Sequence, residues 1–390
     1  MKVEGVGTTG AAAPDGARTF LIRADASVQI GSGHVMRCLT LADELSARGH
    51  RCIFVSRNLP GDLINQTRLR GYEVFDLRPL VEGANCDLPA ASFLYEAWLA
   101  GGWERDASET IEATRGLAID WIVVDHYGID RRWEEQLRRA HPHSGLMVID
   151  DLADRHHAAD VVLDQNLGRR EEDYEGLIPT NSSVLAGLTY SLLRPEFAQH
   201  RKTSLSRKQQ TENGVSRLLI NLGGVDKDNF TEQLLVALET LTDVNESFTV
   251  DVVMGPTAPH LEAVQQTASK SPWRITVHAG TSKMAKIMSE ADVAIGAGGG
   301  TSWERCCMGL PTIVAVLAEN QRRLADKLEE AGVARRLDMD DLPASLTHAW
   351  RVIADDARRR EMSQRAAQLV DGRGVERVSE VLLGSELLNE

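Results

Sequence analysis

The sequence lacks the features that mark membrane-spanning and disulfide-bonded proteins. No apolar run approaches the roughly 20 residues that a membrane helix needs, and residues 1–18 contain no signal-peptide core. The 390-residue chain has only five cysteines. They are Cys38, Cys52, Cys86, Cys306 and Cys307, and no two of them form a C-x-x-C pair. An odd number of scattered cysteines is typical of a reduced protein, so we expect a cytoplasmic protein with no membrane span.

The charge balance and the ligand spacing argue against two further classes of partner. The formal net charge is −14 at pH 7, which disfavours nucleic acid because binding to phosphate backbones needs a cationic surface. Asp150 to His157 offers carboxylates and imidazoles, but the spacing matches neither H-E-x-x-H nor another recognised metal site. We therefore predict no metal, and a solvated loop stiffened by Asp–Arg pairing.

The first glycine-rich turn, Ile30 to Gly33, lacks the residues of two common cofactor motifs. A dinucleotide fingerprint needs G-x-G-x-x-G and an acid after the second strand. Here Met36 takes the third glycine position, and Ser56-Arg57-Asn58 follows the second predicted strand. The Gly-Lys-Ser/Thr ending of a Walker motif is also missing. We expect no nicotinamide cofactor and predict that the protein uses no cofactor at all.

What this turn does contain is a histidine at the start of a helix. An apolar run at 19–25 predicts a strand, and amphipathic spacing after the turn predicts a helix over 34–48. The glycines allow close approach to a ligand, and free N–H groups at the helix start favour anions. His34 would lie at the positive end of the helix dipole, which favours the neutral imidazole that a general base needs. The alternative is a histidine that only caps or packs.

Strands and helices alternate twice along the chain, which predicts two parallel-sheet α/β domains. Predicted strands are 19–25, 52–57, 72–77, 121–126, 146–150 and 160–164, and then 217–222, 248–254, 274–278, 292–296 and 312–317. Predicted helices are 34–48, 60–70, 104–116 and 130–140, and later 319–331 and 343–370. We expect a disordered leader at 1–18, an N-terminal domain at 19–198, a polar linker at 199–214 and a C-terminal nucleotide-binding domain at 215–390.

The second glycine-rich turn lies in the C-terminal half, where the predicted strand 292–296 leads into Gly298-Gly299-Gly300-Thr301-Ser302. Such a turn before a helix is suited to a diphosphate. Glu304 is close enough to bind a ribose diol, and the amides of Asn320 and Gln321 suit a base or sugar edge. We therefore predict nucleotide binding. The alternative is a glycine turn in which Glu304 only favours the helix dipole.

Several short segments together are more specific than any one turn. They span about residues 20–330 and are Arg23-Ala24-Asp25, Ile30 to Arg37, Val124 to Tyr127, Asp150 to His157, Asp164-Gln165-Asn166, Leu192 to Phe197, Asn221 to Asp226, Gly298 to Glu304 and Glu319-Asn320-Gln321. In these segments the sequence resembles the UDP-2,4-diacetamido-2,4,6-trideoxy-β-L-altropyranose hydrolases of pseudaminic acid biosynthesis. Residues 80–103 depart from that family's pattern, which bears on sugar specificity because strand-end loops line active sites.

The resemblance implies a GT-B-like fold of two Rossmann-type domains with the active site in the interdomain cleft. It implies metal-independent, inverting hydrolysis of the UDP-sugar at C1, with His34 as the base or as the group that positions water. The expected ligand-binding residues are Arg23, Asp25, Gly31, Ser32, Gly33, Tyr127, Arg194, Gly224, Thr301, Ser302, Glu304, Asn320 and Gln321.

Two other functions stay open at this point. A GT-B glycosyltransferase, like the enzyme that adds N-acetylglucosamine to a lipid intermediate of the cell wall, would share the fold and the UDP site but use an acceptor in place of water. A non-catalytic nucleotide-sugar sensor would bind UDP-sugar without turnover. The expected partners are a small-molecule UDP-sugar and water, and a monomer is favoured.

Overall fold

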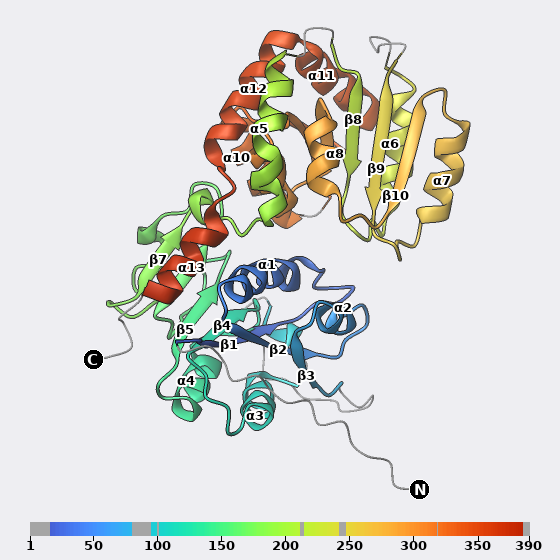
Figure 1. Ribbon diagram of the computed structural model, residues 1–390. Coiled ribbons are helices and arrows are strands. Elements are labelled where there is room, and N and C mark those ends of the chain that lie inside the picture. The colour runs from blue at the N-terminus through green and yellow to red at the C-terminus, as the bar shows by residue number, and fades with distance from the viewer. Residues whose placement is uncertain are drawn as a thin grey trace, which may run out of the picture.

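The computed structural model describes residues 16–79, 95–99, 101–210, 214–241, 247–317 and 319–384. Two lobes are visible, each built on a twisted sheet with helices on both faces (Figure 1). All strand pairs within the two sheets are parallel. The first sheet has seven strands in the order β3-β2-β1-β4-β5-β6-β7, and the second has six in the order β10-β9-β8-β11-β12-β13.

The first sheet consists of β1 (Thr19–Ala24), β2 (Arg51–Arg57), β3 (Glu73–Leu77), β4 (Trp121–Asp125), β5 (Gly145–Ile149), β6 (Val161–Asp164) and β7 (Ser183–Ala186). The second consists of β8 (Arg217–Asn221), β9 (Thr249–Met254), β10 (Arg274–Ala279), β11 (Val293–Ala297), β12 (Thr312–Ala315) and β13 (Ala334–Leu337). The predicted strands are confirmed, whereas β7 and β13 were missed because four-residue strands carry little pattern.

The helices of the first half are α1 (Gly33–Ala47), α2 (Ile64–Leu69), α3 (Trp103–Ala113) and α4 (Arg131–Ala140), with the 3₁₀ turns η1 (Glu96–Trp98), η2 (Glu171–Tyr174) and η3 (Leu188–Tyr190). Those that follow are α5 (Pro195–Gln210), α6 (Phe230–Leu238), α7 (Leu261–Lys270), α8 (Met284–Glu290), α9 (Thr301–Cys307), α10 (Glu319–Glu330), α11 (Leu342–Ala354), α12 (Asp356–Leu369) and α13 (Gly374–Gly384). The helix predicted over 343–370 is two helices, because Asp355 caps a new start by accepting a hydrogen bond from Arg358 N.

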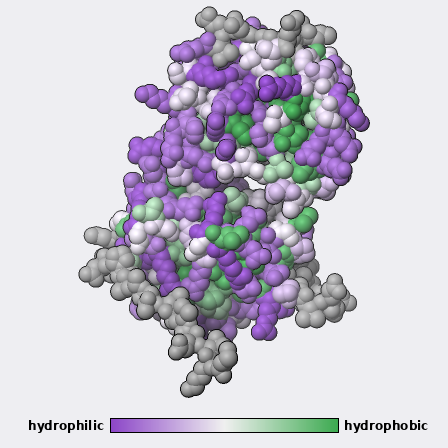
Figure 2. Space-filling model, turned by 45° about the vertical axis from the view of Figure 1, so that its right-hand side comes forward, coloured by the Kyte–Doolittle hydropathy of each residue, from purple (hydrophilic) through white to green (hydrophobic). Residues whose placement is uncertain are grey.

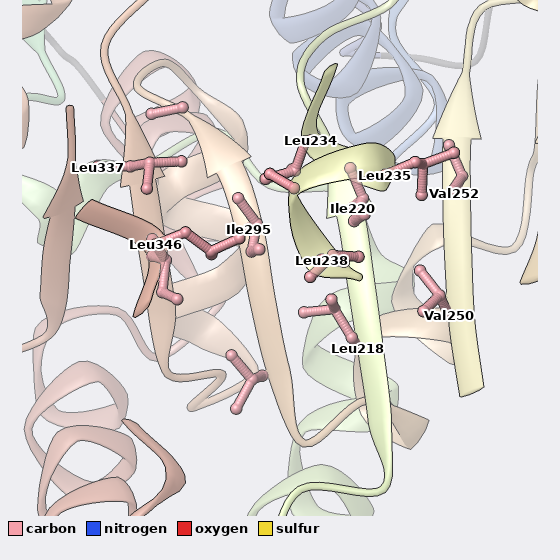
Figure 3. Packing of buried hydrophobic residues seen from close by; sticks show 14 of the residues in the cluster. Leu218, Ile220, Leu234, Leu235, Leu238, Val250, Val252, Ile295, Leu337 and Leu346 are labelled. Carbon is pink, nitrogen blue, oxygen red and sulfur yellow. The ribbon is translucent and has the colours of Figure 1, made fainter. Parts of the chain in front are cut away.

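Both sheets are buried on both faces, which is why their strands read as nearly continuous apolar runs. In β1, Phe20 and Ile22 pack toward α1, while Leu21 packs on the opposite face with side chains from α4. In the second sheet, Figure 3 shows Leu218, Ile220 and neighbouring strand residues pointing toward the leucines of α6 and α11.

The polar stretch that we expected to be a linker, residues 199–214, is mostly the second half of α5. Its polarity misled the prediction because only a narrow stripe of this helix is buried, including Phe197, Ser204 and Lys208. Ser204 Oγ donates to the carbonyl of Met308 at 2.7 Å, and α5 packs against α8 and α9. The two-domain boundaries otherwise stay a prediction.

The last helix, α13, returns to the first sheet after the second sheet is complete (Figure 1). Val375, Val378 and Leu382 are part of the apolar core around α1. Gly374 lies so close to Ser191 that an added Cβ would be 2.3 Å from the Ser191 carbonyl oxygen. The chain therefore crosses between the lobes at two neighbouring places, near residues 191 and 374.

Candidate active site

The first glycine turn lies at the carboxyl end of β1, where ligands of open parallel sheets bind. Gly31 adopts φ +82°, a left-handed conformation that favours glycine. Open space surrounds the Cβ positions of Gly31 and Gly33, and α1 starts at Gly33. Its first turn has no acidic residue, and Ser32 makes no side-chain cap. The N–H groups at this helix start are therefore not neutralised by capping side chains.

His34 is held by Asp125, which the sequence reasoning did not choose as a site residue. The β1–β4 register places Asp125 beside Ala24, one strand away from the turn. His34 Nδ1 lies 2.5 Å from Asp125 Oδ1, and Arg37 donates to both Asp125 oxygens, at 2.6 and 2.7 Å. Burial alone would raise the pKa of Asp125, but Arg37 and His34 outweigh it and hold the pKa well below the usual range. Asp125 is therefore an anion fixed against the ring.

A second carboxylate, Asp151, extends this network. Arg37 Nη1 donates to Asp151 at 2.8 Å, and the Tyr127 hydroxyl donates to the same carboxylate at 2.5 Å. Asn166 Nδ2 donates to its other oxygen at 2.8 Å. Burial, and after it the negative charge of Asp151, raises the pKa of Tyr127, so the phenol stays protonated. Tyr127 was predicted to lie near the sugar, and the structure does bring it beside His34, with ring centroids 4.5 Å apart.

Aromatic side chains from the divergent segment complete this side of the site. Trp98 stacks on Tyr127 with centroids 5.7 Å apart and presents an edge-to-face contact to His34 at 6.4 Å. Tyr95 contacts both Trp98 and Tyr127. Most of the rest of this segment, residues 80–94 and 100, lies outside the described residues.

Arg23 and Asp25 do not join this group, although both were predicted to bind substrate. Their exposures are 0% and 1%. Arg23 forms ion pairs with Asp25 at 2.5 Å and with Asp106 at 2.7 Å, and Arg57 also pairs with Asp106 at 2.7 Å. As placed, these groups fix the ends of β1 and β2 from inside the lobe and present no surface to a ligand.

The second glycine turn has the predicted strand–turn–helix form, with Gly298 buried and Gly300 exposed at the start of α9. Thr301 is half-buried and Ser302 is buried. Glu304 lies 3.6 Å from Arg194, so two residues predicted to bind substrate form an ion pair with each other. Burial raises the pKa of Glu304, opposed by Arg194 and Arg305.

The remaining predicted residues of the second lobe lie at the same edge of its sheet. Gln321 Oε1 accepts a hydrogen bond from Leu317 N at 3.0 Å. A Cβ added at Gly298 would lie 3.3 Å from Gln321 Cβ, so Gln321 lies close to the glycine turn. The Asn320 side chain lies outside the described part of the structure. The Gly224 carbonyl accepts from Gly255 N at 2.9 Å, which joins the turns after β8 and β9.

Contacts between the lobes bring the two strand-end edges together. Lys327 of α10 donates to the carbonyl of Leu167, in the loop after β6, at 2.8 Å. The Arg194–Glu304 pair, by contrast, lies within the second lobe, because Arg194 follows the first crossing and precedes α5. Figure 2 shows the surface hollowed where the two lobes meet. His34 and the second glycine turn therefore belong to facing edges of the two sheets.

The loop from Asp150 to His157 confirms the predicted Asp–Arg pairing, since Arg155 donates to Asp150 at 2.7 Å. The expectation of a solvated loop is wrong for this pair, because Asp150 and Arg155 are 0% and 5% exposed. Within the described ranges, no group of three or more His, Cys, Asp or Glu side chains is arranged to hold a metal ion.

No helix in the same ranges has the length and apolar character required to cross a membrane.

Two parallel-sheet α/β lobes whose strand-end edges face each other define the GT-B fold. The solved structure of MurG from Acinetobacter baumannii shares it, with a TM-score of 0.68 over 95% of this chain and 100% of that one, at 16% identity. A glycosyltransferase of kitacinnamycin gives a TM-score of 0.61 over 94% of this chain and 98% of that one, at 15% identity.

Sequence comparison adds a match to a family domain and similarity to two named proteins. Residues 218–378 match the glycosyltransferase family 28 C-terminal domain. The UDP-2,4-diacetamido-2,4,6-trideoxy-beta-L-altropyranose hydrolase of Campylobacter jejuni (strain NCTC 11168) is 26% identical over 275 residues, which are 70% of this chain and 83% of that protein. The resemblance inferred from the motifs is thereby confirmed.

The spore coat polysaccharide biosynthesis protein SpsG of Bacillus subtilis (strain 168) is 30% identical over 205 residues. That alignment covers 52% of this chain and 58% of SpsG, so the chain spans less than two thirds of that relative's length.

Proposed function

We propose that this protein hydrolyses a UDP-sugar to UDP and the free sugar, by attack of water at the anomeric carbon with inversion. By resemblance, the sugar is 2,4-diacetamido-2,4,6-trideoxy-β-L-altropyranose, and the reaction belongs to pseudaminic acid biosynthesis. The observation that carries the proposal is the His34–Asp125 pair at 2.5 Å. It lies at the carboxyl ends of β1 and β4, where a substrate of this fold binds.

The geometry supports a role for His34 as general base. An ionised Asp125 accepts the hydrogen on His34 Nδ1, which leaves the lone pair of Nε2 free to take a proton. The water oxygen then forms a bond to C1 while its proton moves to Nε2. The bond between C1 and the diphosphate oxygen breaks, and its electron pair leaves with UDP. Arg37 contributes by keeping Asp125 ionised.

The second lobe supplies the nucleotide site in this proposal. The diphosphate lies at residues 298–302, the ribose near Glu304, and the base or sugar edge near Gln321. Trp98, stacked on Tyr127, forms an aromatic wall beside His34, suited to the apolar face and methyl group of a 6-deoxy sugar.

A glycosyltransferase remains the second candidate, because residues 218–378 match a glycosyltransferase domain. It would use the same nucleotide site and the same base, with an acceptor hydroxyl in place of water. The two functions differ in what happens to a UDP-sugar when no acceptor is present.

The deciding experiment measures UDP release from the diacetamido-trideoxy-altrose nucleotide with EDTA present and no acceptor. We expect the wild-type protein to release UDP and His34→Gln to release it about 10²-fold or more slowly. The matched control is His157→Gln, because His157 makes a similar buried pair with Glu134 at 2.7 Å and has no place in the proposed mechanism.

Three results would count against the proposal. Equal rates in the two glutamine variants would remove His34 as the base. Tight UDP binding without release would favour the transferase if an added acceptor restores turnover, and a non-catalytic sensor if none does.

A further inference from the structure

Arg305 is a buried cation directly behind the second glycine turn. Its exposure is 2%, and among the described residues no carboxylate lies within ion-pair distance of its guanidinium. Burial lowers its pKa to about 10, so it is still charged near neutral pH. Glu304 opposes this shift but pairs with Arg194 and makes no direct side-chain contact with Arg305. A buried charge that lacks a direct ion pair destabilises the fold, so an anion bound at the turn would stabilise Arg305.

The guanidinium is bonded to the groups that form the turn. Arg305 Nη2 donates to the Ala297 carbonyl at 2.8 Å and to Ser302 Oγ at 3.0 Å, and Nη1 donates to Thr301 Oγ1 at 3.2 Å. A hydroxyl that accepts a hydrogen bond from arginine keeps its own proton for another acceptor. Open space surrounds the Cβ positions of Gly299 and Gly300, so that acceptor has room at the outer side of the turn.

The sequence makes room for this arrangement at Gly296. A Cβ at that position would lie 2.2 Å from Arg305 Nη1. Any residue other than glycine at position 296 would displace the guanidinium from the turn. The first glycine of the run is therefore needed for Arg305, whereas Gly299 and Gly300 leave the ligand side open.

We infer that Arg305 is a positioning residue for an anion held at residues 298–302. It directs the hydroxyl proton of the half-buried Thr301 toward the ligand, fixes the buried Ser302 within the turn, and adds a positive charge behind it. The inference rests on the proposed function, in which the anion is the diphosphate of UDP. The same charge then stabilises UDP as the leaving group, because negative charge grows on the diphosphate as the bond to C1 breaks.

The test compares calorimetric binding of UDP, uridine and inorganic pyrophosphate to the full chain, without metal. We expect Arg305→Met to lower the affinities for UDP and pyrophosphate at least tenfold while the affinity for uridine changes less than twofold. The affinities of Arg305→Lys for UDP and pyrophosphate should lie between those of the wild-type protein and Arg305→Met. The control is Arg359→Met. Arg359 is also buried in the second lobe, but it donates to the Ile353 and Ala354 carbonyls and pairs with Asp356, so its loss leaves all three affinities unchanged.

Thr301→Val provides an independent variant if Arg305→Met does not fold. This substitution removes the half-buried hydroxyl and keeps the buried charge. We expect the affinity for pyrophosphate to fall and the affinity for uridine to stay unchanged. If the wild-type protein binds UDP and both Arg305→Met and Thr301→Val bind it with the same affinity, this inference alone is overturned. Failure of the wild-type protein to bind UDP or pyrophosphate overturns the proposed function as well.

Discussion

Replacing Asp125 by Asn tests whether the carboxylate determines which ring nitrogen of His34 carries the proton. Asp125 accepts from His34 at 2.5 Å and from Arg37 at 2.6 and 2.7 Å. An asparagine must turn its one oxygen toward Arg37, so its amide N–H points at His34 Nδ1. The ring then carries its proton on Nε2, where the base needs a lone pair.

Loss of a general base costs about 10²–10⁴-fold in rate, equivalent to about 3–5 kcal/mol of transition-state stabilisation. The assay is kcat for UDP release, measured beside UDP affinity. We expect kcat to fall by this factor with UDP affinity changed less than threefold, because in the proposed function the nucleotide is held by the other lobe.

The matched control is Asp292→Asn. Asp292 is equally buried and accepts from Arg207 Nη2 at 2.7 Å and from two backbone N–H groups, at 2.8 and 2.9 Å. It lies at the start of β11, the opposite end of the sheet from the turns. Both variants lose about 3–5 kcal/mol of stability, as expected for breaking a buried charge pair. Equal kcat in both variants would refute the role assigned to Asp125.

Two further predictions concern stability. Burial and the nearby Asp151 raise the pKa of Asp164 to about 6, above the unfolded value of about 3.9. Its favourable contribution is therefore present below pH about 4 and lost as pH rises through about 6. The free energy of unfolding of the wild-type protein should therefore fall relative to that of Asp164→Asn across this window, by up to ~3 kcal/mol. The measurement is thermal unfolding of both proteins as a function of pH, and parallel curves would contradict this. Gly374→Ala places a Cβ 2.3 Å from the Ser191 carbonyl oxygen, so we expect a loss of about 1–3 kcal/mol and faster hydrogen exchange in α13; unchanged exchange would show that the contact is not tight.

Local pattern predicted most of the architecture, because buried parallel strands leave runs that few other structures produce. It failed where a helix buries only a narrow stripe, as in α5, and where a segment packs on a distant part of the chain, as in α13. Neither case shows in a short window of sequence, since the deciding contacts are with residues far along the chain.

In the candidate site, too, some residues could be predicted from local sequence and others could not. His34 was predicted from its own turn, but Asp125 and Arg37 were not chosen, since pairing them requires the strand order that places β4 beside β1. Asp25 shows the converse error. A polar residue at a strand end suggested a ligand contact, whereas its side chain points inward to Arg23.

The return of α13 to the first sheet has a consequence for biosynthesis. Domains usually fold as they leave the ribosome, with the N-terminal one first. Here Val375, Val378 and Leu382 are synthesised only after all six strands of the second sheet, yet they cover α1. During translation the apolar surface that α13 covers in the first lobe therefore stays exposed until the second sheet has been synthesised. The lobe that begins the chain is the last to be finished.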